Sequence, residues 1–146
     1  MIRKLRMIDF KVFQDQEFDF APGTTAIVGP NGSGKTTILE AIEFALFRSV
    51  TRKEKSVKRL EELIRHSRKK AKVQLEFISP LNRREYRVVR TIHPGETNAD
   101  LFLANKHEPE VSGPQRVDTE IVKLLGMTKH AFSALTFVSL AYRVKV

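Results

Sequence analysis

One segment, Gly29 to Thr36, constrains the fold of this chain more than any other part of its sequence. It reads GPNGSGKT and fits the phosphate-binding pattern G-x-x-x-x-G-K-[ST]. A short β-prone run, Thr24 to Val28, precedes it. From Lys35 apolar residues recur at three- and four-residue spacing, which predicts an amphipathic helix that fades near Arg48. A strand, a glycine-rich loop and a helix in this order predict a P-loop in an α/β fold.

Each residue type in the motif has a physical task. Gly32 and Gly34 permit left-handed backbone angles, so that successive N–H groups can face one hollow that suits phosphate oxygens. The start of the helix adds its positive end. Lys35 is expected to reach the β- and γ-phosphates, and the Thr36 hydroxyl is a hard ligand for Mg²⁺. The predicted ATP-binding residues here are Pro30, Asn31, Gly32, Ser33, Gly34, Lys35, Thr36 and Thr37, with Thr36 also as metal ligand. A tight strand-to-helix turn without a ligand would explain one glycine only.

The second acidic site of P-loop hydrolases is missing from the sequence. Hydrolysis needs a further group that holds magnesium and orients water, usually Asp after four apolar residues. The run Val73 to Phe77 ends in Glu76-Phe77 and does not fit. We therefore predict a nucleotide-binding chain with no catalytic residue of its own.

The remaining pattern predicts strands followed by helices. Ile2 to Phe10 and residues 17–20 read as two strands that form a hairpin around Asp15. Three further runs, at residues 73–77, 86–92 and 101–103, predict an antiparallel meander. The other expected elements are a short helix at 57–64, a helix after Ser112-Gly113-Pro114 that Gly126 caps, a helix from Thr128 to Leu135, and a strand at 136–138.

Composition limits the class of protein further. The length of 146 residues suits one domain, and the absence of cysteine excludes disulfides and thiolate metal sites. No run approaches the roughly 18 apolar residues of a membrane span, so we expect a soluble, intracellular protein. The net charge is +9, and Arg48 to Lys72 holds eleven Lys and Arg against three Glu. That segment is either a polyanion-binding patch or a solvated basic helix face.

Several side chains allow two interpretations. The four arginines of the meander, Arg83, Arg84, Arg87 and Arg90, either line a path for DNA or form a solvated strand face. The phenylalanines near the N-terminus are expected in the core rather than as base-stacking platforms. His93, His107 and His130 have no metal-ligand spacing and are expected at the surface.

With its P-loop near the N-terminus and TILEAI at residues 37–42, the chain resembles the N-terminal half of an SMC/SbcC-type ATPase head. Within the ABC-ATPase superfamily the DNA double-strand-break repair branch is closest, and the resemblance covers nearly all of the chain. It implies a P-loop half-domain with a mixed sheet. Asp9 to Phe13 resembles the family's Asn-Phe-Arg segment, which implies a phosphate contact for Lys11. Leu63 to Ser67 resembles the loop that borders adenine, which implies Ile64, Arg65 and His66 in the ATP site.

The resemblance also implies partners and an activity. Residues 1–146 would be the N-terminal lobe, which stops where a coiled coil begins in the family. It would act with the C-terminal lobe of the same head, a second head that dimerises on ATP, a nuclease subunit and DNA, and not with a membrane. ATP hydrolysis is then expected only in the complete head. The expected location is the cytoplasm and nucleoid, or the nucleus of a eukaryote.

One position departs from the family. Phe132 to Val138 resembles the approach to the family's Q-loop, where a glutamine that coordinates magnesium follows, yet Ser139-Leu140 stand there. Either the match fails at this end or the tail from residue 139 is not native. Three rival interpretations remain: a non-hydrolysing nucleotide-binding module that scaffolds DNA, an ABC-type transporter ATPase fragment, and a small P-loop kinase.

Overall fold

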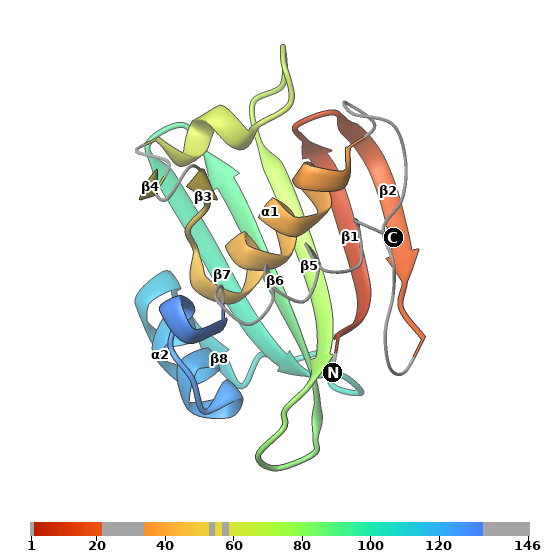
Figure 1. The fold of residues 1–146 in the computed structure, drawn as a ribbon, viewed down its shortest axis with the longest axis vertical. Helices are drawn as coiled ribbons and strands as arrows, with labels where there is room; N and C mark the ends of the chain where they lie inside the picture. Colours follow the sequence, from red (N-terminus) through yellow and green to blue (C-terminus); the bar gives the residue numbers. More distant parts are fainter. Residues whose placement is uncertain (1, 22–33, 53–54, 57–58, 133–146) are drawn as a thin grey trace.

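A six-stranded antiparallel sheet organises the described part of the chain, which in this computed structural model comprises residues 2–21, 34–52, 55–56 and 59–132 (Figure 1). The spatial strand order is β2-β1-β5-β6-β7-β8. The strands are β1 Ile2–Phe10, β2 Phe13–Asp19, β5 Ala71–Ile78, β6 Glu85–His93, β7 Glu96–Leu103 and β8 Val111–Ser112, with a separate ribbon of β3 Thr51–Arg52 and β4 Lys55–Ser56. The described residues also form two α-helices, α1 Lys35–Phe47 and α2 Pro114–Leu125, the 3₁₀-helix η1 Leu60–Leu63 and a helical turn at 129–132.

Strict alternation gives the sheet one buried face. In β5 the side chains of Ala71, Val73, Leu75 and Phe77 are buried, while the residues between them are partly or fully exposed. Helix α1 lies across β1, β5 and β6 on this face, and α2 packs beside it against β7 and β8 (Figure 1). The α/β class and the meander β5-β6-β7 are confirmed. The sheet of the described residues is antiparallel throughout, and the predicted strands at 24–28 and 136–138 lie outside those residues.

Helix α1 runs from Lys35 to Phe47, with Gly34 as its N-cap and Arg48 as its C-cap, close to the predicted bounds. The prediction of an amphipathic helix is wrong in one respect, since α1 is buried on nearly every side. Glu40 and Glu43, which fall off the predicted apolar face, are only 6% and 3% exposed. A helix that is buried all round carries its apolar residues all round.

The predicted hairpin around Asp15 is also misplaced. The turn lies at Lys11 and Val12, and Asp15 sits inside β2 opposite Ile8. Arg6 of β1 donates to both oxygens of the Asp15 carboxylate, over 3.1 and 3.0 Å, and this contact holds the pKa of that carboxyl below its usual range. Asp15 is therefore a cross-strand partner of Arg6 and not a turn residue.

The predicted cap of α2 is confirmed, and the other two predicted helices are found only in part among the described residues. Gly126 caps α2 with a φ of 69°, as predicted. Thr128 precedes a helical turn at residues 129–132, and its hydroxyl accepts from the Ala131 N–H over 3.4 Å. The helix predicted at 57–64 is the four-residue η1 in the described residues.

Candidate nucleotide-binding site

The start of α1 is the part of the predicted P-loop that the structure describes. Pro30, Asn31, Gly32 and Ser33 lie outside the described residues, and only the backbone of Lys35 is described. Gly34 is the N-cap, no side chain caps the helix through a hydrogen bond, and the first turn carries no acidic residue. The positive end of the helix is therefore not compensated by these described residues, as an anion site requires.

Gly34 is in a conformation and a position that only glycine can occupy. Its φ is +97°, in the left-handed region, and it is buried. A Cβ at this position would stand 2.6 Å from Cζ of Phe13 and 3.5 Å from Cγ2 of Val12. The glycine at this point of the motif therefore serves close packing as well as backbone freedom.

The structure brings Lys11 together with Leu63 to Ser67, the segment predicted to border adenine and called the adenine-side segment below. Phe10 and Ile64 form an antiparallel bridge. The Lys11 N–H donates to the Leu63 carbonyl over 2.8 Å, and the Arg65 N–H donates to the Asp9 carbonyl over 2.8 Å. Because Phe13 and Val12 border the point where a Cβ of Gly34 would stand, one hairpin turn connects the residues at 63–65 to the start of α1. Two groups predicted from distant parts of the sequence thus meet at one end of the sheet.

This turn has an unusual backbone. Asp9 and Lys11 have φ values of 51° and 52°, which are uncommon for residues other than glycine. Arg68 approaches the Asp9 carboxylate, with 3.8 Å between its Nε and Oδ1. Backbone conformations of this kind cost about 1–3 kcal/mol each and concentrate at functional sites, where the surrounding bonds hold them.

The remaining predicted residues differ in exposure. Thr36 is exposed, Thr37 is buried, His66 is exposed, and Lys11, Ile64 and Arg65 are partly buried. The exposed Thr36 hydroxyl next to an uncompensated helix N-terminus fits a magnesium ion that arrives with phosphate oxygens. Among the residues that the structure describes, no three His, Asp or Glu side chains gather in a way that would hold a metal by themselves.

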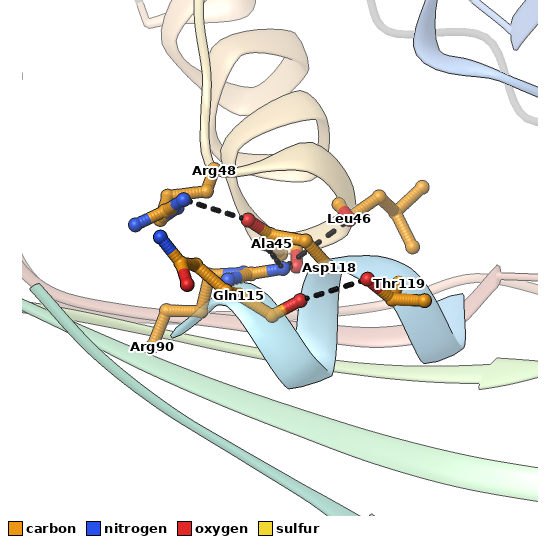
Figure 2. Close-up of polar contacts among 7 residues, drawn as sticks. All are labelled: Ala45, Leu46, Arg48, Arg90, Gln115, Asp118 and Thr119. Carbon is orange, nitrogen blue, oxygen red and sulfur yellow. Dashed lines mark hydrogen bonds and ion pairs between the residues drawn. The ribbon is translucent and has the colours of Figure 1, made fainter. Parts of the chain in front are cut away.

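Arg90 corrects the interpretation of the four arginines. It faces the helices rather than solvent and is completely buried. It donates to the Ala45 carbonyl over 2.7 Å and to the Leu46 carbonyl over 3.3 Å, and its Nη2 lies 2.9 Å from Asp118 of α2 (Figure 2). Burial lowers the pKa of Arg90 to about 10, against the opposing pull of Asp118. Arg48 also pairs with Asp118, at 2.9 Å.

The alternation of residues along β6 predicts that Arg90 is buried, although the charge of an arginine suggests exposure. In β6 the inward positions are Tyr86, Val88, Arg90 and Ile92, so strict alternation already places Arg90 on the buried face. Arg87, at an outward position, lies over the Phe102 ring, 4.4 Å from its centroid. Neither side chain is therefore freely solvated.

In its described residues the basic segment is not a helix face. Between Arg59 and Lys72 the structure has the short η1 and a loop that leads into β5. Arg68, Lys69, Lys70 and Lys72 are exposed on this loop and at the start of the strand. An exposed cluster of one sign is what a polyanion surface requires, although it is equally what a solvated loop presents.

The sheet, the helix after the P-loop glycine and the hairpin turn together define a P-loop nucleotide-binding half-domain. Residues 4–139 match the family described as an AAA domain. The DNA double-strand break repair Rad50 ATPase of Methanocaldococcus jannaschii is 30% identical over 132 residues, which make up 90% of this chain and 12% of that protein. The Rad50 ATPase of Thermoplasma acidophilum is 40% identical over 77 residues, or 53% of this chain and 8% of that protein.

Solved structures agree with these relatives. The SMC head domain from Thermotoga maritima has a TM-score of 0.50 and 30% identity, covering 70% of this chain and 37% of that one. The recombination mediator protein RecF with ATP has a TM-score of 0.61 over 75% of this chain and 28% of that one, and at 19% identity it shows the fold alone.

The chain belongs to this AAA-domain family and is an N-terminal lobe of an SMC/Rad50-type ATPase head, as its resemblance predicted. It spans 8% and 12% of the length of the two Rad50 relatives. Within its described residues no helix is both long and apolar enough to cross a membrane.

Proposed function

We propose that this chain is the ATP-binding half of the head of a DNA double-strand-break repair ATPase. The observation that carries the proposal is the meeting of three sequence-distant parts at the start of α1. The hairpin turn with Lys11 is bonded to the residues at 63–65 and packs on Gly34. A phosphate cradle, a lysine and an adenine-side segment are the parts that an ATP site needs.

In this proposal each residue has a defined task. The backbone of Pro30 to Gly34 and Lys35 hold the phosphates, with Thr37 in the first helical turn, and Lys11 adds a second cation. Ile64, Arg65 and His66 border the base. Thr36 would hold the Mg²⁺ that accompanies ATP, and the ion supplies charge neutralisation at the phosphates.

Hydrolysis is assigned to the complete head. The sequence has no apolar run that ends in Asp, and Leu140 stands where the family has a glutamine. A leucine cannot coordinate magnesium or hold water. The C-terminal lobe, a second head that dimerises on ATP, a nuclease subunit and DNA are the proposed partners, in the cytoplasm and nucleoid or in a nucleus. The tail from residue 139 remains a candidate for non-native sequence, and the family match ends at that residue.

Calorimetric titration with ATP and Mg²⁺ tests the binding function. The parent chain is expected to bind and Lys35→Ala to lose binding while its thermal unfolding is unchanged. Equal affinity of the two proteins would contradict the assignment. Turnover measured with the C-terminal lobe added then separates an ATPase half from a non-hydrolysing DNA scaffold, because only the former gains activity, and Leu140→Gln is expected to raise it.

The exposed basic loop motivates a second test, for DNA. Each phosphate contact releases counterions, so affinity should fall linearly in log salt. Replacing Lys69, Lys70 and Lys72 with Gln is expected to flatten that slope. An unchanged slope would place the DNA surface elsewhere.

A further inference from the structure

Phe13 closes off one side of the last P-loop glycine. Its ring carbons Cζ and Cε2 lie 2.6 and 3.1 Å from the point where a Cβ of Gly34 would stand. Distances this short leave room for hydrogen only, so the ring is in direct contact with the glycine backbone. Gly34 is also the N-cap of α1, where the chain turns into the helix. The ring therefore borders the residue that directs the first helical N–H groups.

The Phe13 ring is itself firmly placed. It packs edge-on against Phe18, with 5.9 Å between the ring centroids and 81° between the planes. It stands opposite Phe10 in the register of β1 and β2, and Phe10 is completely buried. The preceding Lys11 is bonded through its N–H to Leu63. Among the described residues, the ring is thus placed by the hairpin, which is itself bonded to Leu63.

We infer that Phe13 is a positioning residue for Gly34, the last glycine of the predicted phosphate cradle, an inference that rests on the proposed ATP-binding function. Glycine populates left- and right-handed angles about equally, so Gly34 alone does not fix one direction for the loop. A rigid ring against the glycine removes the conformations that would move its backbone toward the hairpin. The direction of the chain at Gly34, where α1 begins, is then set before nucleotide arrives, which reduces the ordering cost of binding.

Two substitutions of Phe13, one with a shorter and one with a longer side chain, test whether the contact of its ring with Gly34 matters. Phe13→Leu shortens the side chain and removes the wall. Phe13→Tyr adds a hydroxyl at Cζ, the atom nearest to Gly34, and pushes into the glycine. Both are expected to weaken ATP binding by about fivefold, as loss of preorganisation. Phe18→Leu is the matched control, because it removes the same ring pair but not the contact with Gly34, and it should change affinity by less than about twofold.

A positioning role differs from ordinary packing in one measurable way. The effect of Phe13→Leu on ATP affinity should change sign when Gly34 is also replaced. In the Gly34→Ala background the added Cβ collides with the Phe13 ring, so Phe13→Leu should there raise ATP affinity, whereas in the parent it lowers it. A merely structural phenylalanine would destabilise both backgrounds alike. Affinities are measured by titration of ATP and Mg²⁺ below the unfolding midpoint of every variant.

The outcomes are distinguishable. If the parent does not bind ATP, or binds as well after Lys35→Ala, the proposed function fails and this inference fails with it. If the parent binds through Lys35 while Phe13→Leu matches the parent, or loses no more affinity than Phe18→Leu, only the inference is overturned. The same holds if Phe13→Leu lowers affinity in the Gly34→Ala background.

Discussion

The two ends of helix α1 are built in opposite ways. At its C-terminal end Arg90 donates to the Ala45 and Leu46 carbonyls, Asp118 joins Arg90 to Arg48, and the last helical turn is covered. At its N-terminal end the described residues provide no side-chain cap and no acidic residue. The C-terminal end of the helix therefore finds hydrogen-bond partners for its backbone carbonyls within the chain.

This difference assigns the ends of the helix different tasks. A helix leaves N–H groups free at its start and C=O groups free at its end, and each set needs partners. The C-terminal carbonyls have an arginine with its charge at the favourable pole. Lys129 adds a hydrogen bond to Ser49 and a contact of 3.7 Å with Glu43. The fixed end anchors the helix to β6 and α2, whereas the other end is the one that we propose for the ligand.

The largest effect is expected from a substitution that removes the anchor at the C-terminal end of α1. Asp118→Ala leaves Arg90 buried without its countercharge, and we expect a loss of about 3 kcal/mol in the free energy of unfolding. Nucleotide affinity of the folded protein should stay unchanged. Asp19→Ala is the control, because Asp19 is 76% exposed beside Lys4 and such pairs contribute less than about 1 kcal/mol. Urea unfolding measures both, and equal losses would argue against an anchoring pair.

The next largest effect is expected from a substitution at the N-terminal end of α1, the proposed ligand end. Gly34→Ala combines strain at a φ of +97° with the 2.6 Å approach of Phe13, and we expect ATP affinity to fall about thirtyfold. Gly113 offers a close match, since it is the N-cap of α2 with a φ of +101° and has no atom within 4 Å of a built Cβ. Gly113→Ala should leave ATP affinity as it is. A parent-like affinity for Gly34→Ala would show that the contact is immaterial.

A smaller effect sharpens the role of Thr36. Its side chain is exposed, so Thr36→Ala should not change stability. With Mg²⁺ present, affinity for ATP is expected to fall about tenfold, the size of one charge-assisted contact. Titrations with EDTA in place of Mg²⁺ should give equal affinities for variant and parent. Thr119→Ala, an exposed threonine of α2, provides the control, and an equal loss there would contradict a metal contact.

The smallest effect concerns the support of the adenine-side segment. The Glu61 carboxylate pairs with Arg59 and accepts from the Gly95 N–H over 3.0 Å, and these contacts lower its pKa. A carboxyl with a lowered pKa contributes stability above its ordinary pKa, and that contribution is lost as pH falls through the lowered value. The unfolding midpoint of Glu61→Gln should therefore lie below that of the parent at pH 7. The two should converge as the pH falls below the lowered pKa, and a constant gap would contradict the linkage.

The residues that we propose for the ligand end could be named from sequence because the requirements of a phosphate cradle are local. The glycines, Lys35 and Thr36 stand in one short motif, and the resemblance supplied Lys11 and the residues at 64–66. The anchored end could not be predicted from charge, since Arg90 and Asp118 are 28 positions apart and meet only after β6 and α2 pack together. The hairpin turn was misplaced for a related reason, because Asp15 is explained by Arg6 across the strand pair and not by a turn. In both cases a side-chain pair between two different elements decided the outcome.

Amide hydrogen exchange with and without ATP and Mg²⁺ tests the contrast between the two ends most directly. The account predicts that nucleotide slows exchange at the start of α1, in the hairpin turn at Lys11 and at residues 63–66. It predicts no change in α2, where Asp118 is already fixed by two arginines. Slower exchange that is confined to α2, or spread evenly over the chain, would contradict the claim that the N-terminal end of α1 is the nucleotide site.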